Sequence, residues 1–247
     1  MIAVAVHGAE GRMGRLLTDL VDGAIDAELV GLVTEPGRSA AAGDFHPRLP
    51  LMGQDRMADA LPAGCVVIDF SLAPALDGLL QAGRRLGAGL VIGTTGFTAA
   101  QEEALGAYAA DFPVVRAANF SIGIPTLQML LQLLARTLPG EFDAEQVEVH
   151  HVTKLDKPSG TAAHLAGVWR AARGGAEVPT HSQRLGGVIG EHTWTFSDQE
   201  ETLVVTHRAH SRRAFLRGVL PAVRFVAGAR PGLYNLTDVL KGLGAAG

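Results

Sequence analysis

Short apolar runs alternate with amphipathic stretches through the first half of the chain, and no other feature restricts the possible folds as strongly. A run that is apolar at every position is typical of a strand covered on both faces, whereas apolar residues at helical spacing predict a helix. The expected strands are residues 2–7, 27–33, 66–70, 89–92 and 114–117, and the expected helices are residues 13–21, 75–86 and 99–109. This alternation predicts an α/β fold with a doubly wound parallel sheet.

The pattern changes near residue 124, where a second, smaller domain of α+β character is expected. Its expected elements are an apolar helix over 127–138, a strand over 146–151, a helix over 161–173, and three segments of a mixed or antiparallel sheet at 184–188, 192–196 and 203–209. We expect the apolar helix to form core and not to bind a membrane.

The end of the chain has no obvious sheet of its own to cover. A last helix over 214–229 and the tail over 233–240 are therefore expected to pack on the first domain. The domain boundaries predicted in this way are 1–123 together with 213–247 for the first domain, and 124–212 for the second.

The composition fits an ordinary globular protein and argues against several classes of partner. Of the 247 residues, 47% are hydrophobic and 19% are charged, which is enough to form a core. The net charge of -4 gives no general attraction to nucleic acid, and no stretch approaches the ~20 apolar residues that cross a membrane. The single cysteine, Cys65, excludes an internal disulfide, and the apolar N-terminus is expected to be a strand and not a signal peptide. We expect a cytoplasmic protein, with residues 36–50 as the most mobile stretch of its first half.

A glycine-rich turn follows the first expected strand and opens the first expected helix, which is the context of a dinucleotide fingerprint. Gly8 allows a tight turn, Gly11 lets a pyrophosphate approach the backbone, and Gly14 lets the helix pack closely on the strand. The spacing is G-x-x-G-x-x-G and not G-x-G-x-x-G, so a simple glycine turn is the alternative. The cofactor-binding residues predicted here are Gly8, Glu10, Gly11, Arg12, Met13 and Gly14. The turn predicts a Rossmann-like domain that binds a dinucleotide.

Two charged residues after the second expected strand bear on the kind of dinucleotide. Glu35 stands about 20 residues beyond the glycine turn, where an acid accepts hydrogen bonds from the adenosine ribose of NADH. Arg38 reaches a 2′-phosphate if the loop folds back, which would suit NADPH. The residues therefore leave NADH and NADPH both open, with Glu35 favouring NADH. A solvated acid and base in a loop is the alternative.

Other strand ends are expected to meet at the same edge of the sheet and to form the rest of a cofactor crevice. The residues predicted to contribute are Phe70, Ser71, Gly93, Thr94, Thr95, Ala118, Asn119 and Phe120. The Gly-Thr-Thr-Gly run that starts at Gly93 offers hydroxyl and backbone groups to a carboxamide. Helix capping by Ser71 or Ser121 is the structural alternative.

The densest chemical run lies between residues 148 and 162. Two histidines, His150 and His151, stand close to Lys154, so proton donors lie beside a cation. The helix expected after Ser159, Gly160 and Thr161 presents free backbone N–H groups that suit a carboxylate. A hydride acceptor that carries carboxylates needs both an anion site and a proton donor. Taken alone, adjacent histidines on a strand face opposite ways, so His151 is equally compatible with a structural role.

The run His150-x-x-x-Lys154-x-Asp156-x-Pro158-Ser159-Gly160-Thr161-Ala162 resembles the signature of dihydrodipicolinate reductases. The glycine turn and the strand ends described above resemble that family's other landmarks in the same order, as do residues 207–212 and 232–240. The resemblance implies an NAD(P)H-dependent reduction of the cyclic condensation product of aspartate semialdehyde and pyruvate, in lysine and diaminopimelate biosynthesis. Whether the substrate is hydroxylated or dehydrated stays open.

The resemblance also implies roles for single residues. His150 is similar to the family's proton donor and Lys154 to its substrate-binding cation, which together form the catalytic pair. His151, Ser159, Gly160 and Thr161 are similar to its substrate-binding residues. The first domain is then the dinucleotide-binding domain, and the second binds a small dicarboxylate and assembles a homotetramer.

Two residues depart from the family's pattern. Gln146 occupies a position that is usually aliphatic, which we interpret as a surface or interface adjustment. Lys157 stands where a small residue is common and adds positive charge close to the expected carboxylate site. Neither departure removes a proposed catalytic group.

Other interpretations of these residues compete with this one. No metal is expected, because the histidines lack the tight spacing or thiolate partners of a metal site. His192 and His207 are expected to form ordinary hydrogen bonds on the sheet surface. A different two-domain dehydrogenase shares the glycine turn but has no reason to contain residues 150–162. A catalytically silent nucleotide sensor has no reason to retain His150, Lys154 and Thr161 together.

Overall fold

The structure is a computed structural model that describes residues 1–244, and the chain divides into two compact units. Unit 1 comprises Met1–Phe120 and the chain from Phe215 onward, and unit 2 comprises Ser121–Ala214. Both boundaries lie a few residues from those expected. Residues 245–247, the end of the first expected domain, lie outside the described residues.

Unit 1 is built on a seven-stranded sheet in which all the strands run parallel. The strands are β1 (Ile2–His7), β2 (Ala27–Thr34), β3 (Leu51–Gly53), β4 (Val66–Asp69), β5 (Gly89–Ile92), β6 (Pro113–Arg116) and β11 (Gly232–Tyr234). Their order is β11-β6-β5-β4-β1-β2-β3, so the chain changes direction across the sheet between β1 and β4. Ligands of doubly wound sheets bind at the carboxyl ends of the strands at such a switch point. The doubly wound prediction is confirmed.

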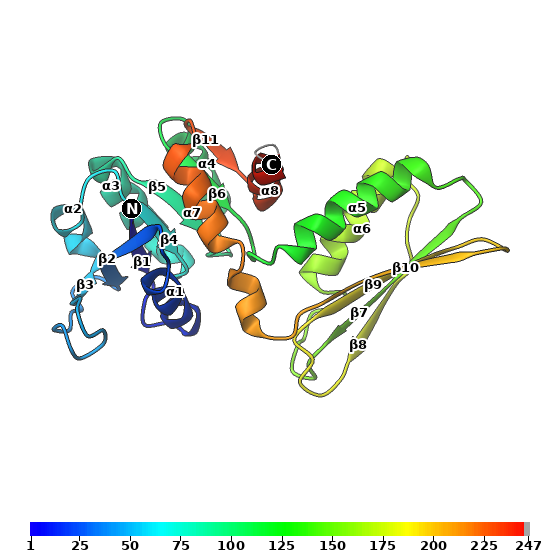
Figure 1. Ribbon diagram of the computed structural model, residues 1–247, viewed down its shortest axis with the longest axis horizontal. Coiled ribbons are helices and arrows are strands. Elements are labelled where there is room, and N and C mark those ends of the chain that lie inside the picture. The colour runs from blue at the N-terminus through cyan, green and yellow to red at the C-terminus, as the bar shows by residue number, and fades with distance from the viewer. Residues whose placement is uncertain (245–247) are drawn as a thin grey trace. The chain divides into compact units, whose positions relative to one another are not determined.

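Helices cover both faces of this sheet (Figure 1). They are α1 (Arg12–Asp22), α2 (Met57–Ala60), α3 (Leu76–Leu86), α4 (Ala99–Ala109), α7 (Val219–Gly228) and α8 (Leu236–Gly244). α1, α7 and α8 pack on one face, and α2, α3 and α4 pack on the other. Successive strand residues alternate between the two cores: Ile68 belongs to the first and Val67 to the second. This double burial explains why the strands are apolar throughout.

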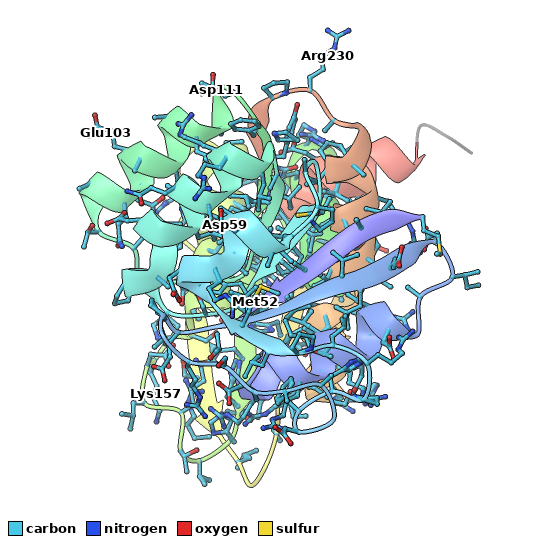
Figure 2. The ribbon with its side chains drawn as sticks, turned by 90° about the vertical axis from the view of Figure 1, so that its left-hand side faces the viewer. Met52, Asp59, Glu103, Asp111, Lys157 and Arg230 are labelled. Atoms are coloured by element: carbon cyan, nitrogen blue, oxygen red, sulfur yellow. The ribbon has the colours of Figure 1, made fainter. Side chains whose placement is uncertain are left out.

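The outer sides of these helices are charged. Glu103 on α4 and Asp111 just after it extend away from the ribbon (Figure 2). Leu105 and Tyr108 of α4 face inward and are fully buried. The helix is thus held to the sheet by its apolar side.

A small part of unit 1 escaped sequence analysis. Strand β3, a 3-10 turn at Gln54–Arg56 and α2 follow one another without a loop, and each is only three or four residues long. Elements this short carry too few residues for periodicity to appear. The stretch before them, residues 36–50, has an antiparallel bridge from Ala40 to Leu51 and a buried His46. Its mobility stays a prediction.

The returning end of the chain completes unit 1. Strand β11 pairs with β6 at the edge of the sheet, and α7 packs across the sheet. The expected helix over 214–229 is divided into a 3-10 turn at Arg212–Leu216 and α7. Gly218 lies at the break, where its N–H donates to the carbonyl of Phe120 at 2.7 Å. A Cβ at this position would meet the same carbonyl oxygen at 2.8 Å.

Unit 2 contains a four-stranded mixed sheet in the order β10-β9-β7-β8. Its elements are α5 (Gly123–Thr137), β7 (Asp143–His150), α6 (Gly160–Ala172), β8 (Thr180–Arg184), β9 (Glu191–Ser197) and β10 (Thr202–Arg208). Helices α5 and α6 cover one face of the sheet (Figure 1). Their core contains Leu131, Trp169 and Trp194. The apolar helix is therefore core, as predicted, and no helix within residues 1–244 is long and apolar enough to cross a membrane.

One strand of unit 2 was misplaced in the sequence analysis. The segment expected at 184–188 is the end of β8 and the turn that follows it, and β8 pairs parallel with β7. The parallel pairing arises because α6 crosses over between the two strands, as in a β-α-β unit. β8 consists of polar residues on the sheet edge, so it has no apolar alternation from which it could be recognised.

Candidate active site and cofactor groove

The glycine turn of unit 1 leaves no room for side chains at two of its glycines. Gly8 has a φ of +78°, and a Cβ there would meet the carbonyl oxygen of Phe70 at 2.7 Å. A Cβ on Gly14 would meet the carbonyl oxygen of Gly8 at 2.0 Å. Gly11 is the N-cap of α1 and has no side-chain cap, so the first N–H groups of the helix are left for a ligand. Only glycine fits at positions 8 and 14, and the free N–H groups of the turn could hold a phosphate.

A groove of about 700 Å³ opens over this turn at the switch point of the sheet. Nine of the predicted residues line it: Gly8, Glu10, Gly11, Arg12, Met13, Glu35, Arg38, Phe70 and Ser71. Gly14 is buried and serves packing. Arg12 opens α1, is exposed, and forms no ion pair with any described residue. Its guanidinium is available to a phosphate.

The far wall of the groove carries a small charged network. Arg38 contacts Glu10 through Nη2 and Oε1 at 2.8 Å, and Glu35 through Nη1 and Oε1 at 3.2 Å. The hydroxyl of Thr34 donates to Oε2 of Glu10 at 2.7 Å. The loop after β2 therefore does fold back toward the glycine turn.

A buried pair supports the floor of the groove. Nδ1 of His7 lies 2.7 Å from Oδ1 of Asp69, and the hydroxyl of Ser71 donates to the same oxygen at 2.6 Å. Burial raises the pKa of Asp69, but the adjacent His7 and the hydrogen bond from Ser71 outweigh it and hold the pKa below its usual value. Asp69 is thus a buried anion that ties the ends of β1 and β4 together. Ser71 bonds Asp69 and caps no helix.

The remaining predicted cofactor residues divide between a second hollow and the core. Thr94, Thr95 and Ala118 line a hollow of about 440 Å³ in unit 1, together with Tyr234 of β11. Gly93 is required there because a Cβ would meet the Phe70 ring at 2.3 Å. Phe120 is fully buried and packs on Phe70, with ring centroids 5.7 Å apart. Phe120 and Asn119 line neither hollow, so Phe120 offers a ligand no side-chain surface.

Unit 2 contains a buried carboxylate beside the predicted proton donor. The Glu148 side chain is 0% exposed; its Oε2 contacts Nδ1 of His150, and its Oε1 lies 2.9 Å from Nη1 of Arg184. Burial raises the pKa of Glu148, but hydrogen bonds from Ser182, Arg184 and His150 outweigh it and keep the pKa below its usual value. Glu148 is therefore an anion that orients His150 through Nδ1 and leaves Nε2 free to act.

The protonation of His150 is finely balanced. Burial lowers the pKa of His150, the contact with Glu148 raises it, and the charges of Lys154 and Arg184 lower it, with a net shift downward. Gly190 lies against the free nitrogen, because a Cβ there would meet Nε2 at 3.1 Å. The absence of a side chain at residue 190 keeps Nε2 accessible.

Two more histidines continue the row across the sheet. His192 of β9 pairs in register with Glu148 of β7 and with His207 of β10. The ring of His192 lies edge-on to that of His150, with centroids 5.3 Å apart. Burial, followed by the neighbouring histidines, lowers the pKa of His192 to about 4. The prediction of an ordinary surface histidine is wrong for His192, which is 3% exposed and lies on the helix-covered face of the sheet.

The predicted anion site forms at the start of α6. Ser159 is the N-cap and accepts a hydrogen bond from the N–H of Ala162 at 3.2 Å, while Gly160 and Thr161 form the first turn. Lys154 lies in the loop before the helix, with Nζ 2.8 Å from Oδ1 of Asp156. The hydrogen bond from Lys154, together with one from the Gly160 backbone, holds the pKa of Asp156 below its usual value. The lysine proposed for substrate binding is thus already paired with a carboxylate.

Arg184 joins this loop to the buried carboxylate. Its Nε donates to the carbonyl of Lys154 at 3.1 Å, and its Nη2 donates to the carbonyl of Asp156. One guanidinium therefore positions both the Lys154 loop and Glu148. His151 lies outside this group; it is half-buried, and its Nδ1 is 2.7 Å from the hydroxyl of Thr153.

The two departures from the family's pattern have different environments. Gln146 is 0% exposed and donates to the carbonyl of Ala162 at 3.1 Å and to Thr180 Oγ1 at 3.2 Å. Its interpretation as a surface or interface adjustment is therefore wrong: Gln146 ties β7 to α6 and β8 in the interior. Lys157 is exposed, and its side chain extends away from the ribbon (Figure 2). An effect of Lys157 on substrate affinity stays a prediction.

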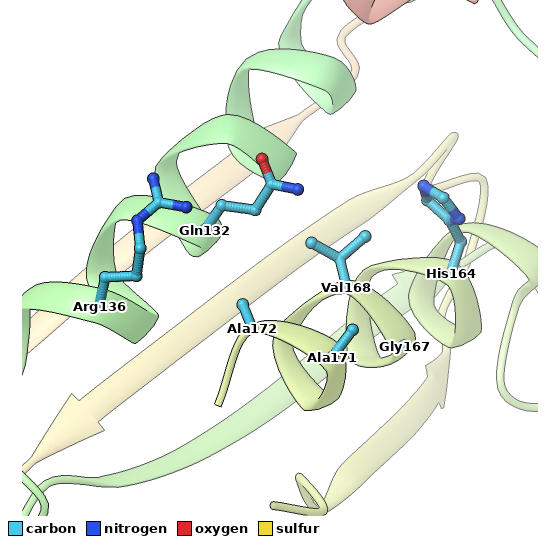
Figure 3. Close-up of a pocket in the computed structure, with 7 residues that line it drawn as sticks. All are labelled: Gln132, Arg136, His164, Gly167, Val168, Ala171 and Ala172. Atoms are coloured by element: carbon cyan, nitrogen blue, oxygen red, sulfur yellow. The ribbon is translucent and has the colours of Figure 1, made fainter. Parts of the chain in front are cut away.

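Another hollow of unit 2 lies between α5 and α6 (Figure 3). It has a volume of about 560 Å³ and is lined by Gln132, Arg136, His164, Gly167, Val168, Ala171 and Ala172. None of the predicted site residues lines it. Among the described residues, no three His, Cys, Asp or Glu side chains are placed to hold a metal ion.

Comparison with known proteins agrees with this geometry. A family model described as the N-terminus of dihydrodipicolinate reductase matches residues 2–120, and one described as its C-terminus matches residues 123–240. The chain belongs to the dihydrodipicolinate reductase family.

Relatives in this family match over nearly their whole length. A 4-hydroxy-tetrahydrodipicolinate reductase from Alkalilimnicola ehrlichii is 40% identical over 261 residues, covering 96% of this chain and 98% of the relative. One from Stenotrophomonas maltophilia is 40% identical over 240 residues, covering 97% and 98%. A dipicolinate-bound dihydrodipicolinate reductase from Paenisporosarcina sp. TG-14 has the same fold, with a TM-score of 0.81 at 24% identity over 96% of this chain and 99% of that one.

Some residues of this dihydrodipicolinate reductase site were missed by sequence analysis. Glu148 entered the sequence analysis only as the first residue of the densest chemical run, and Arg184 only as the first residue of an expected sheet segment. The missed residues are Glu148, Arg184, Gly190, His192 and His207. Each of them lies far from residues 150–162 in sequence or belongs to no motif. The one available signal was the i, i+2 spacing of Glu148 and His150, which places both side chains on one face of a strand.

Proposed function

We propose that this chain reduces 4-hydroxy-tetrahydrodipicolinate to tetrahydrodipicolinate with NADH or NADPH, in lysine and diaminopimelate biosynthesis. The observation that carries the proposal is the buried Glu148 beside His150, next to a helix N-terminus and to a lysine that already pairs with a carboxylate. A proton donor next to an anion site is what the reduction of a cyclic dicarboxylate requires.

The residues of the unit 1 groove fit a nicotinamide dinucleotide. Gly8, Gly11 and the start of α1 would hold the pyrophosphate, with Arg12 as a counter-charge, and Glu35 would accept hydrogen bonds from the adenosine ribose. Thr94 and Thr95 are assigned to the carboxamide end. The chemistry supplied by the bound cofactor is transfer of a hydride. We infer that NADH is the preferred form, since the wall of the groove carries two carboxylates and one guanidinium.

His150 would deliver the proton that accompanies the hydride. Its Nδ1–H donates to the anionic Glu148, so Nε2 carries a proton only when the ring is an imidazolium. Burial disfavours that charged form in the free protein. An anionic substrate would favour it by its own charge, so that the proton becomes available when substrate is bound.

Lys154 and the start of α6 would hold one carboxylate of the substrate. In the structure Lys154 pairs with the side chain of Asp156, so the substrate has to share or displace this internal carboxylate. Ser159 keeps the first turn of α6 in place through its cap, and Thr161 adds a hydroxyl at the same turn. His151 is assigned to the edge of this site.

The open face of the unit 2 sheet supports a homotetramer. The face opposite α5 and α6 carries Val147, Val149, Thr193 and Thr195, and the neighbouring Val204 is 54% exposed. β-branched residues of this kind suit sheet-to-sheet packing between copies of the chain. Light scattering after size exclusion would measure the mass: a tetramer is expected, and a smaller species is expected for Val204→Glu. A monomeric wild-type protein would contradict this part of the proposal.

The activity is tested by oxidation of NADH or NADPH at 340 nm with aspartate semialdehyde, pyruvate and a coupling synthase. Oxidation that depends on the synthase is the expected result, and kcat/KM then ranks the two cofactors. His150→Ala is expected to lower kcat by roughly 10²–10⁴, the usual value of general acid catalysis, with cofactor binding retained. No oxidation despite cofactor binding would contradict the proposal and favour a nucleotide sensor.

A further inference from the structure

The wall of the unit 1 groove has one more carboxylate than ribose binding requires. Glu35 follows β2 and has the usual position for contact with the ribose hydroxyls. Glu10 lies within the glycine turn itself, and it contacts the same guanidinium as Glu35 does. We propose that Glu10 withholds Arg38 from the 2′-phosphate of NADPH and thereby sets the preference of this chain for NADH. This inference rests on the proposed cofactor role of the groove.

Glu10 is the better fixed of the two acids. Its side chain is 24% exposed, compared with 68% for Glu35. One carboxylate oxygen of Glu10 binds Nη2 of Arg38 at 2.8 Å, and the other accepts the hydroxyl of Thr34 at 2.7 Å. Thr34 is buried at the end of β2, so Glu10 is anchored to the sheet.

The loop that carries Arg38 is also held in place. The N–H of Gly37 donates to Oδ1 of Asp55 at 2.9 Å, and the N–H of Arg38 donates to the carbonyl of Glu35 at 3.3 Å. Gly37 has a φ of +73°, which a side chain would strain. Arg38 is thus directed back into the groove, where both ends of its guanidinium are already bound by carboxylates.

This arrangement discriminates between the two cofactors by charge. The hydroxyls of an adenosine ribose donate hydrogen bonds to carboxylates and need no guanidinium. A 2′-phosphate is a dianion that needs a cation, and here it meets two carboxylates and an arginine that both carboxylates already contact. Binding of NADPH would first have to break the contact between Glu10 and Arg38.

The contact between Glu10 and Arg38 contributes little to the stability of the fold. A stability measurement can therefore distinguish a structural role of Glu10 from a role in cofactor selection. The Arg38 side chain is 55% exposed, and exposed ion pairs contribute little to stability. We therefore expect Glu10→Gln, which keeps the shape and the Thr34 contact, to leave the thermal unfolding temperature unchanged.

The test measures binding without turnover. The dissociation constants of NADH, NADPH, ADP and 2′,5′-ADP are measured by calorimetry for the wild type, Glu10→Gln, Arg38→Ala and the double variant. Glu28→Gln is the matched control, because Glu28 is an exposed acid of β2 that does not line the groove. In Glu10→Gln, the affinity for NADPH and 2′,5′-ADP should rise by about tenfold and that for NADH and ADP should change by less than about threefold.

The double variant locates the effect on Arg38. With Arg38 replaced by alanine, Glu10→Gln should raise the affinity for 2′,5′-ADP by no more than about twofold, because no guanidinium is released. A gain that is equal for both cofactors, or that persists in full without Arg38, would overturn the inference. If the wild-type protein binds none of the four nucleotides, the proposed function itself fails, and that outcome is distinct from either of these.

Discussion

Glu148→Gln tests how the buried carboxylate supports the proposed proton transfer. Glutamine keeps the length and shape of the side chain and removes its charge. In the structure this charge contacts Nδ1 of His150 and lies 2.9 Å from Arg184. The amide cannot stabilise an imidazolium as a carboxylate does, so the protonated form of His150 becomes harder to reach.

The magnitude follows from the separation and the burial. Two unit charges about 4 Å apart interact with an energy of about 4 kcal/mol at an effective dielectric constant of about 20. That corresponds to roughly 10³ in rate as an upper limit, and reorientation of the amide recovers part of it. We expect kcat to fall by about 10² to 10³. Because Glu148 raises the pKa of His150, its loss should also move the limb of the kcat/KM profile to lower pH.

The assay is the steady-state rate with the coupling synthase, measured across pH for the wild type and the variant. Calorimetric binding of NADH to unit 1 is the control for correct folding of the cofactor groove, and thermal unfolding reports the stability of the whole chain. Removal of one partner of a buried ion pair costs about 3–5 kcal/mol, so the variant is expected to unfold at lower temperature.

A second variant keeps the prediction decisive if Glu148→Gln does not fold. Glu148→Gln combined with Arg184→Gln removes both charges of the buried pair and leaves no uncompensated cation, while His150 still lacks its carboxylate. A loss of kcat is again expected, with a smaller shift of the pH limb, because the charge of Arg184 that is also removed had lowered the pKa of His150. A folded variant with kcat within about threefold of the wild type and an unmoved pH limb would refute the role of Glu148.

Three further predictions follow from the geometry of single residues. Gly190→Ala should lower kcat by about tenfold or more, because the added Cβ crowds Nε2 of His150. A Cβ on residue 187 would meet nothing within 4 Å, so Gly187→Ala should leave kcat unchanged in the same steady-state assay. Gly8→Ala should weaken NADH binding by more than about tenfold in calorimetry, because its Cβ meets backbone at 2.7 Å. Gly64 has a similar positive φ of +72° but open space around it, so Gly64→Ala should leave NADH binding intact. Equal losses of NADH affinity in the two variants would attribute the effect to backbone strain alone. If protonated His150 is required, kcat/KM should fall as pH rises through a pKa below the usual histidine value, and kcat should fall only at a higher pH, since the bound anion raises the pKa. Superimposable profiles would contradict this.

Sequence patterns were sufficient for the parts of the fold that have long or repeated signals. The strands of unit 1 are apolar because both faces of the sheet are covered, and this composition is visible in the order of the residues alone. β3, α2 and β8 were missed or misplaced because each is short or polar, so neither the helical nor the strand periodicity of apolar residues appears in its sequence. The division of the expected last helix at Gly218 depends on a contact with Phe120, which lies about a hundred residues earlier in the chain.

The candidate site shows the same division between local and distant information. Gly8, His150 and Lys154 lie in motifs whose spacing is local, so their side-chain types already indicate the chemistry. Gln146 was misjudged because its burial depends on α6 and β8, which no local pattern of β7 reports.

The amino-acid sequence by itself therefore determined the doubly wound plan, the glycine cradle and the run of residues from His150 to Thr161, because each depends on spacing along the chain. Only the tertiary structure decided which groups surround them: the carboxylate of Glu148 on Nδ1 of His150, Arg184 between Glu148 and the Lys154 loop, and Glu10 on Arg38. The physical reason is that hydrogen bonds and ion pairs act over a few ångström in space, and folding brings together residues whose separation in sequence carries no record of the contact.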